Sequence, residues 1–331
     1  MLKLTDFDYI LPKELIAQYP LKERDAARLL VLDRKNGKIE HRFFKNITDY
    51  LERDDLLVLN NTKVLPSRLK GQRLTGGKVE ILLLNRGDGL TFNALIKPSR
   101  IKIGEKVVFN GNKISGVVSA KNEITFSAPN INSVYNLGMM PLPPYIKREP
   151  EKLDEVYYQT VYAQKEGAIA SPTAGLHFTA ELITQIKSCG INVAYITLHI
   201  SYSTFRPVKS EDVTKHKMEE EYFKIGNNAI GLIEQTHSKL RRICAVGTTS
   251  LRALETYASW GIKEGNTNLF IYPGYRLKMV DALLTNFHLP RTTLFILVCA
   301  FAGEKLIKRA YQEAIDRKYR FYSYGDAMSI I

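Results

Sequence analysis

The chain has 331 residues and a mass of 37.6 kDa, a length typical of one large domain or two ordinary ones. Hydrophobic residues make up 45% and charged residues 24% of it, which excludes a chain that is disordered or fibrous throughout. Lys and Arg number 47 against 34 Asp and Glu, so the net charge is +13. This excess of positive charge favours polyanions as partners.

The cysteines and the chain ends predict the compartment. Cys189, Cys244 and Cys299 lie far apart and form no CxxC pair, so reduced thiols are expected rather than a disulfide or a zinc site. The first 20 residues carry acidic side chains where a signal peptide needs an apolar run. The longest apolar stretch, Leu294–Ala302, is far shorter than the roughly 20 residues that span a bilayer. These features predict a cytoplasmic protein without membrane contact.

Residues 1–65 alternate helix and strand signals. Pro12 predicts a short helix that continues to Gln18, because proline suits the first turn of a helix. The apolar runs Arg28–Asp33 and Leu56–Asn60 predict two buried strands.

Residues 66–151 have a different character. Short apolar runs separated by Gly, Asn and Asp turns predict the strands Val79–Asn85, Leu90–Lys97, Lys106–Asn110, Ile114–Ala120 and Glu123–Ser127. The spacing indicates a small all-β barrel, which we place at 66–151 as an insertion. The segment holds 13 basic and 6 acidic residues, so its surface is either a nucleic-acid contact or simply a solvated basic face.

Residues 152–331 return to alternating strands and helices. Strands are predicted at Asn192–Ile200, Glu220–Ile225, Arg242–Val246 and Asn268–Ile271, and helices after Thr179 and at Asn228–Ser238, Thr249–Trp260 and Gly303–Arg317. This alternation indicates an open α/β sheet. The predicted architecture is therefore an α/β domain at 1–65 and 152–331, split in sequence by the β-barrel.

The strongest local signal for a ligand lies at residues 245–252. A strand runs into Gly247, then into Thr248 and Thr249, and then into a helix that carries Arg252 one turn further on. The free N–H groups of a helix N-terminus attract an anion, so a carboxylate or phosphate site is predicted. Ordinary helix capping by the threonines is the alternative.

Three further segments place a histidine among polar residues. Ser171–Phe178 contains Thr173, Gly175 and His177, the strand ending at His199 leads into Ser201–Pro207, and Asp281–Arg291 contains Asn286 and His288. Imidazoles that end strands or sit in such loops are candidates for proton transfer, although each is equally a candidate for a structural hydrogen bond. No metal-ligand or nucleophile motif is present in the sequence.

The run Pro141–Arg148 closes the barrel region. Its prolines predict a stiff extended connector. Tyr145, with Lys147 and Arg148 beside it, is suited to stacking on a base and holding phosphate, and a rigid interdomain linker is an equal alternative.

Seven long motifs distributed over nearly the whole chain resemble the S-adenosylmethionine:tRNA ribosyltransferase-isomerase family of queuosine biosynthesis. They are FDYILPKELIAQYP at 7–20, LVLNNTKVLPSRL at 57–69, PLPPYIK at 141–147, YQTVYA at 158–163, SPTAGLHFT at 171–179, AVGTTSLRALE at 245–255 and VDALLTNFHLPR at 280–291. The chain departs from the usual family pattern at Ser201 and Ser203, where glycines are usual, at Ser171, where alanine is usual, and at Asn61, where aspartate is usual.

The resemblance implies the reaction and its partners. The family moves and isomerises the ribosyl group of S-adenosylmethionine onto 7-aminomethyl-7-deazaguanine in tRNA, and adenine and methionine leave. Within the family motifs we assign His177, His199, His288 and Asp281 to proton transfer, without separating acid from base. We assign binding of the small substrate to Thr173, Gly175, Gly247, Thr248, Thr249, Arg252, Asn286 and Arg291. We assign tRNA binding to Tyr145, Lys147 and Arg148.

The expected protein is a monomer that binds tRNA and S-adenosylmethionine, the latter as substrate, and holds no resident cofactor or metal. Two alternatives remain open at this point. One is a divergent relative that binds tRNA without catalysis, and the other is a methyltransferase that uses the same donor.

Overall fold

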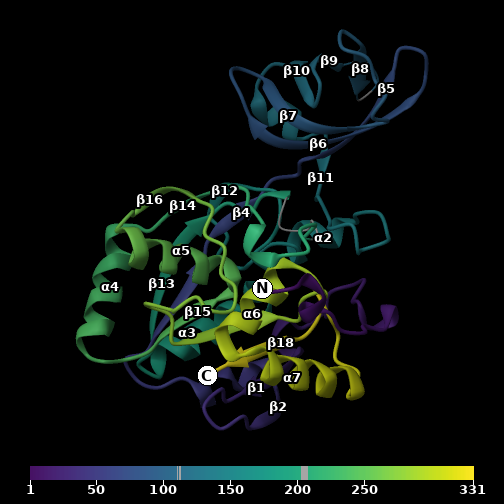
Figure 1. Ribbon diagram of the computed structural model, residues 1–331. Coiled ribbons are helices and arrows are strands. Elements are labelled where there is room, and N and C mark those ends of the chain that lie inside the picture. Colours follow the sequence, from purple (N-terminus) through teal and green to yellow (C-terminus); the bar gives the residue numbers. More distant parts are fainter. Residues whose placement is uncertain (110, 112, 203–207) are drawn as a thin grey trace.

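The protein consists of a large body built on one nine-stranded sheet and a small barrel that stands apart from it (Figure 1). The computed structural model describes residues 1–109, 111, 113–202 and 208–331. The order of the large sheet is β16 (Glu264–Thr267), β14 (Glu221–Lys224), β13 (Asn192–Leu198), β3 (Leu56–Asn60), β15 (Ile243–Val246), β17 (Ala282–Asn286), β18 (Ala327–Ile330), β1 (Arg28–Leu32) and β2 (Ile39–Phe43).

The centre of the large sheet is parallel. Strands β13, β3, β15 and β17 pair in parallel, as do β18 and β1, whereas β17 and β18 are antiparallel and β14, β16 and β2 add antiparallel edges. The carboxyl ends of the four central strands therefore meet at one edge, which is where ligands of open α/β sheets usually bind.

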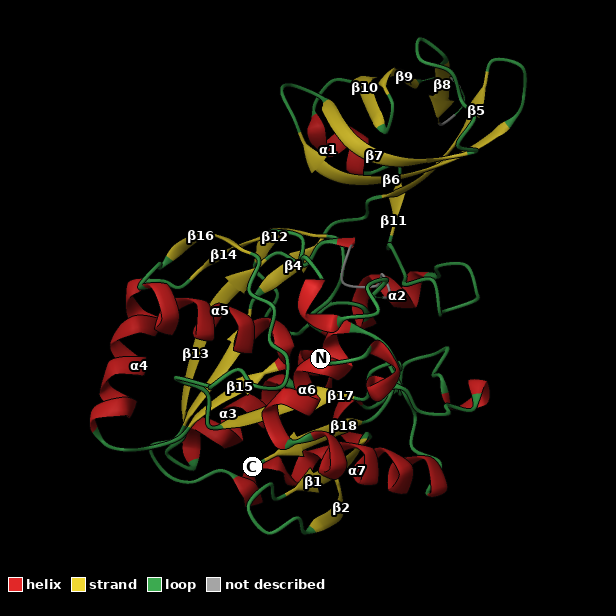
Figure 2. Cartoon of the chain, viewed as in Figure 1, coloured by secondary structure: helices red, strands yellow, loops and turns green. Residues whose placement is uncertain are grey.

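Helices cover both faces of this sheet (Figure 2). Strand residues alternate between the two faces, so Leu57 and Leu59 pack in one apolar cluster and Val58 in the other. The cluster with Val58 includes residues of α4 (Asn227–Ser238), α5 (Gly247–Trp260), α6 (Thr293–Ala302) and α7 (Glu304–Asp316), and the opposite cluster includes α3 (Ala180–Ser188).

Six antiparallel strands close the barrel. The order is β5 (Arg68–Arg73), β6 (Lys78–Arg86), β7 (Thr91–Lys97), β10 (Glu123–Ser127), β9 (Ile114–Ala120) and β8 (Lys106–Phe109), and β5 pairs again with β8. Alternate residues such as Ile81, Phe92 and Phe126 fill its interior, as a small barrel requires. The two-residue strand β11 (Gly138–Met139) pairs with β5 beside the connection to the body.

The remaining elements are short. They are α1 (Ile131–Tyr135) and α2 (Lys152–Tyr157), the pair β4 (Thr62–Val64) with β12 (Lys165–Ala168), and 3₁₀ turns at Leu4–Phe7, Lys13–Leu15, Arg24–Ala26, Phe44–Tyr50, Thr173–His177 and Val213–Lys215. In the part of the chain that the structure describes, no helix is long and apolar enough to cross a membrane.

Two predicted elements are wrong. The helix from Pro12 to Gln18 is only a 3₁₀ turn at Lys13–Leu15, because Ile16 leaves the turn to form a bridge with Phe321. No strand forms at 268–271: β16 lies directly before it, and Leu269 instead accepts a hydrogen bond from Arg252 through its carbonyl.

The predicted fold class, an α/β sheet with a β-barrel, is confirmed. The predicted barrel strands are found within one residue of their expected ends, apart from Asn110, which lies outside the described residues. The domain limits at 65/66 and 151/152 stay a prediction.

Candidate active site

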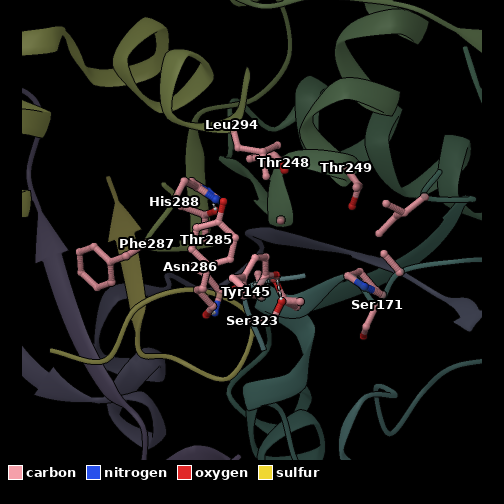
Figure 3. A pocket seen from close by; sticks show the side chains of 17 residues that line it. Tyr145, Ser171, Thr248, Thr249, Thr285, Asn286, Phe287, His288, Leu294 and Ser323 are labelled. Atoms are coloured by element: carbon pink, nitrogen blue, oxygen red, sulfur yellow. Dashed lines mark hydrogen bonds between the residues drawn. The ribbon is translucent and has the colours of Figure 1, made fainter. Parts of the chain in front are cut away.

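A pocket lies at the carboxyl edge of the central strands. It encloses about 580 Å³ of space, its open mouth included, a size suited to a small molecule. Figure 3 shows side chains from several segments pointing toward it. The lining residues are Tyr145, Ala170, Ser171, Pro172, Thr173, Ala174, Ile200, Gly247, Thr248, Thr249, Thr285, Asn286, Phe287, His288, Leu294, Tyr322 and Ser323.

The first turn of α5 forms one wall of this pocket. Gly247 has a φ of 85°, a backbone conformation that glycine adopts without strain and that turns β15 directly into the helix. A Cβ on Gly247 would meet only ordinary contacts, at 3.5 Å or more, so the residue serves the turn rather than a close approach. Thr249 Oγ1 accepts a hydrogen bond from Asn60 Nδ2 at 3.2 Å. The predicted helix N-terminus is thus presented to the pocket, with Thr248 and Thr249 beside it.

His288 lies in the pocket just beyond the end of β17. Its Nε2 is 2.8 Å from Thr285 Oγ1, and its backbone N–H donates to Tyr311 Oη at 3.0 Å. Burial lowers the pKa of His288 to about 3, because an apolar environment penalises the charged imidazolium. The ring is therefore neutral at pH 7 and has one nitrogen able to accept a proton.

His177 reaches the pocket through Asn286. Asn286 Nδ2 lies 3.2 Å from His177 Nε2, and Asn286 Oδ1 accepts from Thr173 Oγ1 at 2.9 Å. The imidazole itself lines a second, smaller hollow behind the pocket and packs on the ring of Phe44, with 4.9 Å between ring centroids. Burial lowers the pKa of His177 to about 4.

Gly175 explains how this loop packs so tightly. A Cβ there would lie 2.0 Å from Tyr162 Oη and 2.9 Å from Thr160 Cγ2. Both distances are shorter than real Cβ contacts. Gly175 lines neither the pocket nor the hollow behind it. The structure shows its part in the packing of this loop, and its predicted contact with substrate stays a prediction.

His199 lies outside the pocket lining. Its Nδ1 is 2.7 Å from Thr62 Oγ1, and its ring stacks on Tyr222 with 5.5 Å between centroids. Burial lowers its pKa. Its neighbour Ile200 does line the pocket, so His199 sits next to the site rather than in it.

Arg252 does not reach the pocket. Its guanidinium is buried and bound to the carboxylate of Glu221, and it also donates to the carbonyl oxygens of Leu269 at 3.0 Å and Thr267 at 3.3 Å. One turn into α5, the side chain points toward the β14–β16 edge of the sheet. Arg252 thus forms a buried ion pair, and its predicted contact with substrate stays a prediction.

Asp281 and Arg291 are also engaged elsewhere. Asp281 precedes the first residue of β17, so about 17 Å of strand separates it from Asn286, and its Oδ2 accepts from the backbone N–H of Ile243 at 2.9 Å. Arg291 forms an ion pair with Asp8 at the surface. Neither lines the pocket.

The three residues predicted to bind tRNA have different surroundings. Tyr145 lines the pocket, and its ring meets Tyr322 edge-on with 3.9 Å between centroids. Arg148 forms two 2.7 Å hydrogen bonds to the buried carboxylate of Asp154. Lys147 is exposed, and its Nζ donates to the carbonyl oxygen of Pro144.

The four positions at which the chain departs from the usual family pattern also have different surroundings. Ser171 lines the pocket, and its buried hydroxyl has no hydrogen-bond partner among the residues described. Asn61 Oδ1 accepts from Thr197 Oγ1 at 2.7 Å. Ser201 is not among the described residues with positive φ, and its N–H donates to Glu221 at 2.8 Å. Ser203 lies outside the described residues.

The sequence prediction missed several pocket residues, foremost Tyr322 and Ser323. They come from the segment after α7 and carry no recognisable motif. The available signal was the polar and aromatic run at 322–326, which directly precedes an apolar strand. Tyr322 has a φ of 74°, which is costly for a bulky residue and is held by hydrogen bonds with Phe287 and Asn286.

The fold and this pocket define an α/β protein with a pocket at the carboxyl ends of its central strands and a basic barrel beside it. The family model of the queuosine biosynthesis protein matches residues 4–330. The chain is 51% identical to the S-adenosylmethionine:tRNA ribosyltransferase-isomerase of Sulfurihydrogenibium sp. (strain YO3AOP1) and 48% identical to that of Aquifex aeolicus (strain VF5), with 100% of each chain covered in both comparisons.

A solved structure agrees with these relatives. The crystal structure of S-adenosylmethionine tRNA ribosyltransferase from Thermotoga maritima is 37% identical in sequence, matches with a TM-score of 0.58, and the alignment covers 98% of this chain and 100% of that one. The chain belongs to the queuosine biosynthesis protein family, and the resemblance inferred from its motifs is confirmed.

Proposed function

We propose that this protein is an S-adenosylmethionine:tRNA ribosyltransferase-isomerase. It transfers and isomerises the ribosyl group of S-adenosylmethionine onto 7-aminomethyl-7-deazaguanine in tRNA, which yields epoxyqueuosine-tRNA, adenine and methionine. The observation that carries this proposal is the match over the full length to relatives of that name. We further propose that it acts as a monomer in the cytoplasm.

The first turn of α5 is the proposed site for the carboxylate of S-adenosylmethionine. The free N–H groups of a helix N-terminus and its partial positive charge favour an anion. Gly247 and Thr248 line the pocket at this turn, and α5 has 14 residues, enough for a developed helix dipole. The apolar lining from Ile200 and Leu294 suits the uncharged parts of the nucleoside.

The proposed chemistry begins with loss of a proton from ribose C5′, which the adjacent sulfonium makes acidic. Adenine must then leave and the neutral amine of the tRNA base must attack, so protons move at least three times. His288 is the proposed acceptor of one proton, because its imidazole lines the pocket and histidine is a common proton acceptor in catalysis. His177 is proposed to orient Asn286, through which it contacts the site.

Release of adenine from S-adenosylmethionine in the presence of tRNA tests the function. Replacement of His288 by alanine should lower kcat by about 10²–10⁴-fold, the usual contribution of a general acid or base. His237→Ala is the matched control, because His237 lies exposed in the last turn of α4 and its loss should leave the rate unchanged.

The products decide between the classes of function. Adenine with methionine supports the proposal. Adenosylhomocysteine would identify a methyltransferase, and tRNA binding without either product would identify a binding module. A His288→Ala variant as fast as the unmodified protein would remove His288 from the mechanism while leaving the reaction in place.

A further inference from the structure

A groove separate from the pocket lies between the barrel and the connector that leads back to the body. It encloses about 1060 Å³ of space, its open mouth included. One wall is the outer face of β6 and β7, and the other is the proline-rich segment 141–149. The sequence prediction placed tRNA binding on this connector but assigned no residue of the facing barrel strands.

The groove has an apolar floor with an aromatic side chain at its edge. Leu82 and Leu95 are directly opposite each other in the β6–β7 ladder and both face the groove. Pro143 and Pro144 face them from the connector, and Tyr202 lines the groove from the body. Bases of single-stranded nucleic acids bind such surfaces by stacking on an aromatic ring and on apolar groups.

The charged residues of the groove leave two lysines available for phosphate. Four cationic side chains and two carboxylates line it. Arg68 Nε binds Glu80 at 2.8 Å, and Glu149 is bound by Lys70 at 2.9 Å, so both carboxylates are neutralised. Arg148 is held by Asp154. Across the described part of the chain, Lys97 and Lys147 form no ion pair.

The groove and the pocket are neighbours along two segments of chain. Tyr145 and Ile200 line the pocket, whereas Lys147 and Tyr202, each only two residues further on, line the groove. Two residues of extended chain span about 7 Å at most. A ligand in the groove can therefore lie close to a ligand in the pocket.

We propose that this groove binds an unpaired nucleotide of the tRNA anticodon loop beside the base that is modified. Tyr202 and the Leu82–Leu95 floor contact its base, and Lys97 and Lys147 contact phosphate. This inference rests on the proposed function. It adds where the RNA is bound and that the bound nucleotide is unpaired.

The test measures the Kd of an anticodon stem-loop RNA at several salt concentrations. Lys97→Ala should raise the Kd and lower the slope of log K against log salt by about 0.7, the value for one phosphate contact to a single strand, and Lys97→Arg should restore both. Lys121→Ala is the matched control, because Lys121 is exposed in the β9–β10 turn away from the groove.

Tyr202 tests the contact with the base. Tyr202→Ala should raise the Kd of the stem-loop about 5- to 150-fold, as loss of one stacked base does, and Tyr202→Phe should retain the affinity. A blunt RNA duplex without unpaired nucleotides should bind the Tyr202→Ala variant as it binds the unmodified protein.

The outcomes separate this inference from the proposed function. If the unmodified protein releases adenine but Lys97→Ala and Tyr202→Ala bind the stem-loop as it does, the groove assignment is wrong and the function stands. Equal loss of duplex and stem-loop affinity in Tyr202→Ala also overturns it. If the unmodified protein releases no adenine but Lys97→Ala and Tyr202→Ala weaken binding of the stem-loop, the proposed reaction is wrong and the groove assignment stands.

Discussion

Arg252 is a buried cation that binds residues of β14 and β16 at the edge of the large sheet. As part of the motif at 245–255 it was expected to hold the carboxylate of S-adenosylmethionine. In the structure its side chain is 5% exposed and forms an ion pair with Glu221, whose side chain is 1% exposed. We therefore predict that Arg252→Ala acts mainly on stability.

The size of the effect follows from what the substitution leaves behind. Removal of the guanidinium takes the charged partner away from the buried Glu221 carboxylate. It also leaves the carbonyl oxygens of Thr267 and Leu269 without that donor. Breaking a buried pair by removing one partner costs about 3–5 kcal/mol. The same reasoning gives Glu221→Gln a similar cost, and the double variant Glu221→Gln/Arg252→Met should lose less than the two singles together.

Urea unfolding of the four proteins provides the assay. Lys308→Ala is the control, because its i,i+4 pair with Glu304 on α7 is only half-buried and should contribute no more than about 0.5 kcal/mol. An Arg252→Ala protein of unchanged stability with a raised KM for S-adenosylmethionine would refute this reasoning and return Arg252 to the substrate.

Two further predictions concern the site. The folded pKa values of about 4 for His177 and about 3 for His288 lie below the unfolded value near 6.5, so the stability these rings contribute is complete above pH 6.5 and is lost as the pH falls toward 4. Unfolding free energies at pH 7 and pH 5 should differ by less in His177→Asn than in the unmodified protein, and an equal difference would contradict the burial argument. Gly175→Ala should destabilise by more than Gly247→Ala, because a Cβ at Gly175 collides with Tyr162 Oη at 2.0 Å whereas Gly247 meets only the cost of its φ, about 1 kcal/mol. Urea unfolding of both variants compares them, and Gly175→Ala with Tyr162→Phe should recover part of the loss.

The sequence predicted those strands and helices whose own residues show a clear apolar periodicity or turn signal. Short alternating runs closed by Gly and Asn turns identified five of the barrel strands, since each strand buries every second residue. The strand Arg68–Arg73 was missed because four of its six residues are charged or amide side chains, and only Leu69 carries a fully buried side chain. Its place in the sheet follows from partners 6 to 36 residues further along the chain.

The candidate site was predictable only where motif and strand end coincide. Gly247 and Thr248 follow β15, Asn286 is the last residue of β17 and His288 lies just beyond it, so the rule for carboxyl ends places them together. Arg252 and Asp281 lie in the same motifs but contact other elements. Arg252 binds Glu221 of β14 and the carbonyl oxygen of Thr267 in β16, and Asp281 lies at the opposite end of β17 from Asn286. Sequence spacing alone does not show which of these elements a side chain contacts.

The connector between barrel and body is hydrogen bonded to a segment that lines the pocket. Arg148 binds Asp154 through two 2.7 Å hydrogen bonds, and Tyr324 Oη donates to the same carboxylate at 2.7 Å. Tyr324 follows Ser323, which lines the pocket and is hydrogen bonded to Tyr145 of the connector. The connector is thus bound to the segment that forms the pocket wall, so the groove on its barrel side keeps a fixed separation from the pocket. For the RNA binding that we propose, this arrangement predicts one nucleotide of the loop in the groove and the next in the pocket. Arg148, bound to Asp154, holds the connector in place, and its contact with phosphate stays a prediction.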